Sequence, residues 1–197
     1  MKIYDISQEV FSSEVFPGDP APMREKLSSI GEGAVCNLTA FSMCAHNGTH
    51  IDAPYHFFDH GETVERLDLS RMVGYAYVAE RAGDVDANGA RAILQAAKET
   101  CAESAKRILI KGEAVVTAEA AEVFAHANVE LVGNESQTVG PKNAPMQVHK
   151  ILLGKGIVLL EGIRLRTVPE GVYLLCAQPL SLGGADGSPC RAILISF

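Results

Sequence analysis

Six side chains that can bind a metal or transfer a proton are concentrated in one short segment, "AHNGTHIDAPYHFFDHG" (45–61). The chain has only six histidines in 197 residues, and four of them lie here. The six side chains are His46, His50, Asp52, His56, Asp59 and His60. Imidazole nitrogens and carboxylate oxygens are ligands that suit Zn²⁺ and Mn²⁺. The segment therefore points to a metal site.

The backbone conformation of the segment decides which of these side chains can meet. His46 and His50 have the i, i+4 spacing of the helical zinc motif H-E-x-x-H. However, Gly48 and Thr49 are poor helix formers, and Pro54 follows closely. The sequence therefore predicts an extended segment over 46–52.

Side chains on an extended segment alternate between its two faces. His46, His50 and Asp52 would then share one face, and Gly48 would leave an open space between the histidines. A single histidine on a strand is usually an ordinary hydrogen-bonded residue, but three ligands on one face favour a metal site. Three protein ligands also leave a coordination position open, which is typical of catalytic zinc.

An open position predicts hydrolytic chemistry. Water bound to a metal there has its pKa lowered to about 7, which makes hydroxide available at neutral pH. An imidazole that does not bind the metal would then transfer protons, and His56 and His60 are the two candidates.

A second pair of ligand types lies about a hundred residues downstream, in "MQVHKILLGKGIVLLEG" (146–162). His149 is near the start of an expected helix, and Glu161 ends an apolar strand. The two side chains meet if the helix packs antiparallel to the strand that follows it. Burial of Glu161 would be costly without a cation or a donor beside it. The alternative is a carboxylate that faces solvent at the end of a strand.

The elements that must position these residues alternate in the C-terminal half of the chain. Apolar periodicity and capping residues predict helices over 87–103, 117–127 and 146–154. Strands are expected over 2–7, 36–43, 74–80, 107–111, 129–133, 157–161, 172–177 and 191–196. Three prolines make "FPGDPAP" (16–22) a surface loop. The pattern predicts a compact α/β domain with a mixed sheet.

Length and composition predict a single domain over residues 1–197. The net charge of −7 argues against nucleic acid as a partner. No apolar run is long enough to cross a membrane, and the N-terminal segment lacks the apolar core of a signal peptide. Five scattered cysteines indicate free thiols. We therefore expect a cytoplasmic protein.

Several segments together resemble the metal-dependent cyclase family, which includes bacterial kynurenine formamidase and isatin hydrolase. "HNGTHIDAPYHF" (46–57) is similar to the family signature H-x-G-T-H-x-D-x-P-x-H. The other segments with family-like sequences are "YDIS" (4–7), "FPGD" (16–19), "HKILLGKGIVLLEG" (149–162) and "PLSLGGADGSPCRAIL" (179–194). The resemblance thus covers nearly the whole chain.

This resemblance implies a fold of the swivelling β/β/α type and a homodimer or higher homo-oligomer with the active site near the subunit interface. It also implies one or two Zn²⁺ ions, with Mn²⁺ as the alternative metal. His46, His50 and Asp52 would bind one ion, and Asp52, His149 and Glu161 would bind the other, so that Asp52 bridges them.

The chemistry implied by the resemblance is hydrolysis of a small-molecule amide. A metal-bound hydroxide attacks the carbonyl carbon, and His56 protonates the leaving nitrogen. The leading expectation is an arylformamidase, which converts N-formylkynurenine to kynurenine and formate. The alternatives are hydrolysis of a cyclic amide, imide or lactone, and a metal-binding module without catalysis.

The sequence departs from the family pattern around the substrate. Formamidases tend to carry an Asp and a Ser where this chain has Glu135 and Thr138. The chain also has no tryptophan, whereas a tryptophan near the "FPGD" loop often walls the aromatic pocket of those enzymes. Phe16 is expected to replace it as the substrate-binding ring, because any aromatic ring can stack on an aryl group.

Overall fold

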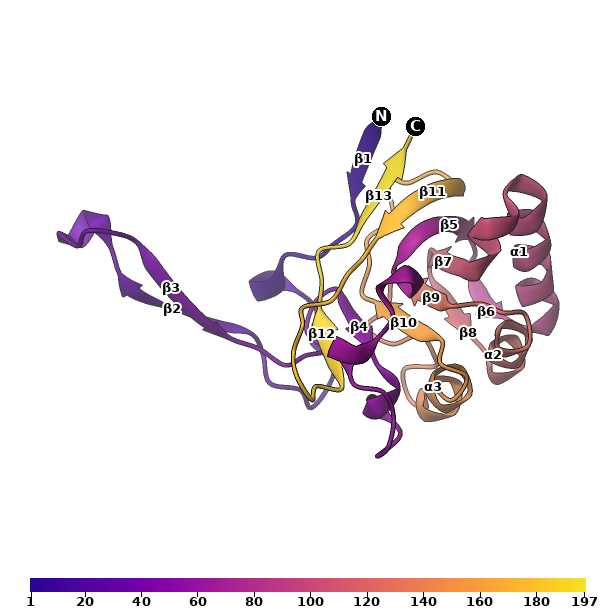
Figure 1. The fold of residues 1–197 in the computed structure, drawn as a ribbon, viewed down its shortest axis with the longest axis horizontal. Coiled ribbons are helices and arrows are strands. Elements are labelled where there is room, and N and C mark those ends of the chain that lie inside the picture. The colour runs from indigo at the N-terminus through magenta and orange to yellow at the C-terminus, as the bar shows by residue number, and fades with distance from the viewer.

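A nine-stranded sheet forms the centre of the computed structural model, which describes residues 1–197 (Figure 1). The strand order is β1-β13-β11-β5-β7-β9-β10-β4-β12. The bounds of these strands are β1 (Lys2–Asp5), β4 (His50–Asp52), β5 (Val73–Glu80), β7 (Arg107–Lys111), β9 (Leu131–Asn134), β10 (Val158–Glu161), β11 (Gly171–Cys176), β12 (Gly187–Pro189) and β13 (Ile193–Ser196). Strands β5, β7, β9 and β10 are parallel, and the other pairings are antiparallel. The predicted α/β class with a mixed sheet is confirmed.

Three helices lie together beside this sheet in Figure 1. They are α1 (Ala87–Thr100), α2 (Ala118–Ala125) and α3 (Met146–Leu153). A small parallel pair, β6 (Gly83–Val85) and β8 (Ala114–Val116), precedes α1 and α2. The Asp86 carboxylate accepts a hydrogen bond from the Gly89 N–H and caps α1, and the Thr117 hydroxyl caps α2 in the same way. Helices α1 and α2 therefore begin directly after their capping residues.

The central strands β7, β9 and β10 are buried on both faces, which explains why they are almost continuously apolar. Alternate residues of β7 enter two different clusters, with Ile108 and Ile110 on the helical side and Leu109 on the other. Strand β10 behaves likewise, since Leu159 packs with the helices and Leu160 packs on the opposite side. The two clusters thus pack against both faces of β10, and Ile51 of the neighbouring β4 packs in the second cluster.

The predicted elements agree with the structure except at their ends and in short strands. The helix expected over 87–103 ends at Thr100, and a separate 3-10 turn covers 102–106. The loop over 16–22 is confirmed. None of the three helices combines the length and the apolar character that a membrane span requires.

One hairpin leaves the body of the molecule as an extended arm (Figure 1). It consists of β2 (Met23–Ser28) and β3 (Leu38–Ser42), which pair only with each other. The strand predicted over 36–43 is therefore correct in type, but it does not join the main sheet. Strand β2 was not predicted, because its sequence "MREKLS" shows no clear alternation of apolar and polar residues. This is consistent with the exposure of most of its side chains.

Candidate metal centre

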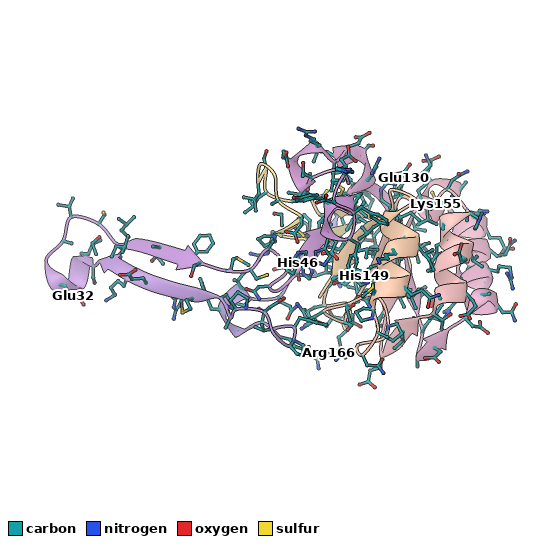
Figure 2. The ribbon with its side chains drawn as sticks, turned by 90° about the horizontal axis from the view of Figure 1, so that it is seen from below. Glu32, His46, Glu130, His149, Lys155 and Arg166 are labelled. Atoms are coloured by element: carbon teal, nitrogen blue, oxygen red, sulfur yellow. The ribbon has the colours of Figure 1, made fainter.

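Three strands and one helix bring the ligand-type side chains together. Strand β4 lies between β10 and β12 and is antiparallel to both, with His50 opposite Glu161. His50 and Asp52 point to one face of β4, and Ile51 between them is buried in the hydrophobic core on the other. Helix α3 supplies His149, whose Nε2 lies 3.1 Å from Glu161 Oε1. Figure 2 shows His149 close to His46.

The prediction of one extended segment over 46–52 is wrong for its first half. The strand begins only at His50, and residues 45–49 form a turn closed by the Asn47 side chain, which accepts a hydrogen bond from the Cys44 N–H. Gly48 has a left-handed φ of 68°, so the turn, and not an open space for a metal, explains the glycine. The turn nevertheless brings His46 to the same place as β4.

Asp52 is shared by two groups of potential ligands. Its Oδ1 lies 2.8 Å from His46 Nδ1 and 3.4 Å from His50 Nε2, and these three residues form the first group. Its Oδ2 lies 3.6 Å from His149 Nε2, and Glu161 completes the second group. In each group the ligand atoms lie within 4.8 Å of one another. The structure therefore brings together all five residues for which the sequence predicted metal binding.

Burial and neighbouring charges explain the shifted pKa values of these side chains. Burial opposes protonation of His46, but hydrogen bonds to Asp186 and Asp52 outweigh it and raise its pKa to about 11. The pKa of His50 rises to about 9, since Asp52 and Glu161 outweigh its burial. Despite its own burial, Asp52 has a pKa well below the ordinary value, because His46 and His50 donate hydrogen bonds to it.

The donor set fits a divalent metal. His50, Asp52, His149 and Glu161 are almost completely buried, with side-chain exposures of 4% or less. Buried carboxylates need a compensating positive charge, which either protonated imidazoles or a cation can provide. Mixed imidazole and carboxylate ligands are those that Zn²⁺ and Mn²⁺ bind. These residues therefore have the chemistry of a metal centre.

His56 lies beside the two groups and belongs to neither. The 3-10 turn Pro54–His56 redirects the chain after β4, so strand alternation does not place this residue. Its Nδ1 lies 2.8 Å from Asp186 Oδ2, and the same oxygen lies 2.9 Å from His46 Nε2. Asp186 was not predicted as a site residue. Its position inside the family-like segment 179–194 is the sequence signal that could have identified it.

A cavity of about 190 Å³ opens onto these residues. Phe16 and Phe57 line it together with Gln137 and Thr138, so the structure places the predicted substrate-binding ring at the site. Thr138 is 4% exposed, and its hydroxyl has no hydrogen-bond partner. Glu135 does not line the cavity, because its carboxylate accepts hydrogen bonds from backbone N–H groups of Gly112 and Leu165.

Two histidines are not part of this arrangement. His60 is exposed and lines none of the cavity that holds the ligands. His126 is exposed at the end of α2, where its Nδ1 lies 2.7 Å from the Glu122 carbonyl oxygen. Neither therefore has the position of a ligand.

The sequence and the fold match known proteins over nearly their whole length. Residues 4–141 match the family described as "Putative cyclase". The kynurenine formamidase of Erythrobacter litoralis is 32% identical over 207 residues, which cover 98% of this chain and 93% of that protein. The predicted family is thereby confirmed.

Solved structures support the same assignment. A potential metal-dependent hydrolase with cyclase activity superposes with a TM-score of 0.78 at 26% identity, over 98% of this chain and 96% of that one. Isatin hydrolase A from Labrenzia aggregata has a TM-score of 0.81 at 19% identity, over 98% and 93% of the two chains, and shows that the fold is shared.

These matches also bear on the chemistry predicted from the sequence. They confirm the predicted class of activity, a metal-dependent hydrolase of amide C–N bonds, and they support a metal cofactor. This chain belongs to the cyclase family of metal-dependent hydrolases.

Proposed function

We propose that this protein is an arylformamidase that hydrolyses N-formylkynurenine to kynurenine and formate. The main structural observation is that Asp52 is shared by two buried ligand groups, beside an imidazole and a cavity with aromatic walls. The full-length similarity to the kynurenine formamidase of Erythrobacter litoralis supports this substrate. Hydrolysis adds water across the amide bond, so that the formyl carbon gains a hydroxyl group and the aryl nitrogen gains a hydrogen.

We assign the metal ligands by their place in the two groups. His46, His50 and Asp52 would hold one Zn²⁺, and Asp52, His149 and Glu161 would hold a second. When bound, such ions supply Lewis-acid activation of water and of a carbonyl oxygen. Mn²⁺ suits the same oxygen and nitrogen ligands and is the alternative metal.

The remaining residues would bind the substrate and move its proton. Phe16 and Phe57 offer ring faces and edges to an aryl group in the cavity. The only hydrogen bond of the His56 ring is the one at Nδ1, which leaves Nε2 for transfer of a proton to the leaving nitrogen.

A hydrolysis screen tests this proposal. The purified protein is assayed with N-formylkynurenine, isatin, simple cyclic imides and lactones, while its metal content is measured in parallel. The proposal predicts the highest kcat/KM for N-formylkynurenine in zinc-loaded protein. A preference for a cyclic substrate would replace the arylformamidase with a cyclic-amide hydrolase, and a metal-loaded protein inactive on all of them would favour a binding module.

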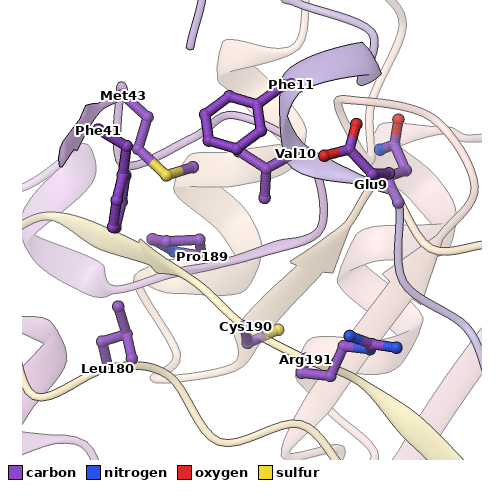
Figure 3. A pocket seen from close by; sticks show the side chains of 10 residues that line it. Glu9, Val10, Phe11, Phe41, Met43, Leu180, Pro189, Cys190 and Arg191 are labelled. Carbon is purple, nitrogen blue, oxygen red and sulfur yellow. The ribbon is translucent and has the colours of Figure 1, made fainter. Parts of the chain in front are cut away.

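We also propose that two copies of the chain associate through the arm. An isolated two-stranded hairpin is marginally stable in water, yet the arm exposes most of its apolar side chains. Those at least half exposed are Met23, Leu27, Ile30, Val35, Leu38 and Phe41. An apolar pocket of about 450 Å³ lies at the base of the arm, with Phe11, Phe41 and Met43 around it (Figure 3). A second copy carries both the arm and the pocket, so the two surfaces can cover each other in a symmetric pair.

Light scattering coupled to size exclusion tests the dimer. Wild-type protein is expected at twice the chain mass, and Leu38→Asp is expected to shift it toward the monomer. Leu69→Asp is the matched control, because Leu69 is about as exposed as Leu38 but lies outside both the arm and the pocket. A monomeric wild-type chain would contradict the proposal.

A cytoplasmic location is also a proposal, supported by the five unpaired cysteines and testable by cell fractionation.

A further inference from the structure

One oxygen of Asp186 contacts two imidazoles that have different expected roles. Its Oδ2 lies 2.9 Å from His46 Nε2 and 2.8 Å from His56 Nδ1, and the two rings lie 4.1 Å apart between centroids. We propose that Asp186 is a positioning residue that fixes the orientation and the tautomer of both His46 and His56. This inference rests on the proposed function, in which His46 binds a metal and His56 transfers a proton.

The carboxylate selects the tautomers because an ionised carboxylate only accepts hydrogen bonds. The nitrogens that face it, His46 Nε2 and His56 Nδ1, must therefore carry their hydrogens. In a neutral imidazole the other nitrogen then has the lone pair. For His46 the other nitrogen is Nδ1, which faces the Asp52 carboxylate and therefore also carries a hydrogen in the metal-free protein. Loss of that hydrogen on metal binding would leave the Nδ1 lone pair for the first ligand group. For His56 the other nitrogen is Nε2, which makes no hydrogen bond within the protein.

This arrangement gives each imidazole what its role requires. Histidines that bind metals usually donate their second N–H to a carboxylate or carbonyl, which fixes the ring and increases its basicity as a ligand. A proton-transferring histidine needs the same support, because the wrong tautomer presents a hydrogen where a lone pair is required. Asp186 supplies both functions at once and so connects the metal ligand to the proton carrier.

The backbone holds Asp186 in this position. The residue directly precedes β12, and its carbonyl oxygen accepts a hydrogen bond of 2.9 Å from the Ala53 N–H. Its neighbour Gly187 lies opposite Asp52 in the sheet register. The Asp186 side chain is 40% exposed, whereas that of its hydrogen-bond partner His46 is 12% exposed. The carboxylate is thus held at the sheet and not on a free loop.

Substitution of Asp186 tests the proposal with three readouts. Asp186→Asn, Asp186→Ala and Asp186→Glu are compared with Asp59→Asn, which removes an exposed carboxylate from the neighbouring segment. Zinc affinity is measured by chelator competition, kcat and KM by steady-state kinetics, and ring tautomers by ¹⁵N NMR of labelled histidines. We expect Asp186→Asn and Asp186→Ala to lower zinc affinity and kcat each by about 10- to 100-fold, with a smaller change in KM. The NMR signals of His56 should show loss of its Nδ1–H tautomer, and Asp186→Glu should restore part of each loss.

A second background separates the two effects of Asp186. In His56→Ala, the further change Asp186→Asn should lower zinc affinity by the same factor as in wild-type protein, but it should not lower kcat further. An unchanged His56 tautomer in Asp186→Asn would overturn the proposal. Loss of a whole metal equivalent in that variant would also overturn it, since Asp186 would then be a ligand, as the proximity of His46, His56 and Asp186 permits. If wild-type protein hydrolyses none of the amides, the proposed function fails, while zinc affinity and the tautomers still test Asp186.

Discussion

His149 Nε2 lies 3.1 Å from Glu161 Oε1, although twelve positions separate the two residues in the chain. A short turn joins α3 to β10, and the start of the helix comes to lie beside the end of the strand. Both side chains are buried, and the Glu161 and Asp52 carboxylates outweigh burial and raise the pKa of His149. The second ligand group thus depends on one helix–strand connection, and it shares Asp52 with the first.

Substitution of Asp52, the carboxylate shared by both ligand groups, should remove the metal from both of them. We expect Asp52→Ala to lose both metal equivalents, whereas Glu161→Ala should retain metal in the group formed with His46 and His50. Elemental analysis of purified protein gives the metal-to-chain ratio for each variant. His60→Ala is the control and should retain the full content, since His60 is exposed and outside the site. If Asp52→Ala retained one full equivalent of metal, Asp52 would not be a ligand shared by both groups.

Substitution of His56 should separate chemistry from metal binding. His56 contacts Asp186 but belongs to neither group that contains Asp52. His56→Ala should therefore keep its metal and lose about two to four orders of magnitude in kcat, the range typical of a general acid or base. Kinetics of the metal-loaded variant measure this loss, with His60→Ala again as the control. Near-wild-type turnover of His56→Ala would assign proton transfer to another group, and a slow His60→Ala would point to His60.

Metal uptake should release protons. The pKa values of about 11 for His46 and about 9 for His50 keep both imidazoles protonated at pH 7.5, and ligation requires them to be neutral. We expect release of about two protons per chain when zinc binds. Calorimetric titrations in buffers with different ionisation enthalpies measure this number. Binding without proton release would show that these imidazoles are already neutral.

The same pKa values predict how pH affects the metal-free protein. Both values lie above the unfolded value of about 6.5, so protonation of His46 and His50 stabilises the fold fully below about pH 6.5. This contribution is lost as the pH rises through about 9 and about 11. Thermal unfolding of the chelator-treated protein should therefore show a Tm that falls between pH 7 and pH 10. A Tm that is constant or rises over this range would be inconsistent with the raised pKa values.

A methyl group at Gly187 should disturb the first ligand group. A Cβ at this position would lie 2.7 Å from His46 Cε1 and 2.8 Å from the Ile51 carbonyl oxygen, closer than real contacts allow. We expect Gly187→Ala to reduce the free energy of unfolding by about 1–3 kcal/mol and to weaken metal binding through displacement of His46. Denaturant titration and zinc competition measure the two effects. Gly183→Ala is the matched control, because its added methyl group would meet no atom within 4 Å. Equal behaviour of the two variants would show that Gly187 is not a packing constraint.

The sequence by itself determined the chemical identity of the candidate site and most of the elements around it. His50 and Asp52 follow strand alternation, and the capping residues Asp86 and Thr117 mark the starts of their helices. These features are local, because they depend on spacing and on backbone preferences over a few residues. His149 and Glu161 could be paired from the sequence because a short connection between a helix and a strand has few geometries.

Only the tertiary structure decided the contacts that join distant segments. Asp186 reaches His46 across 140 positions because β12 pairs with β4, and no local pattern encodes that pairing. The turn at Gly48 and the separation of the arm from the main sheet were likewise missed. The propensity of a segment to form a strand does not specify which strand it pairs with. A turn can also bring a side chain to the same place that strand alternation would, as it does for His46. The position of each ligand therefore depends on the sheet register, which is fixed only when the whole core packs.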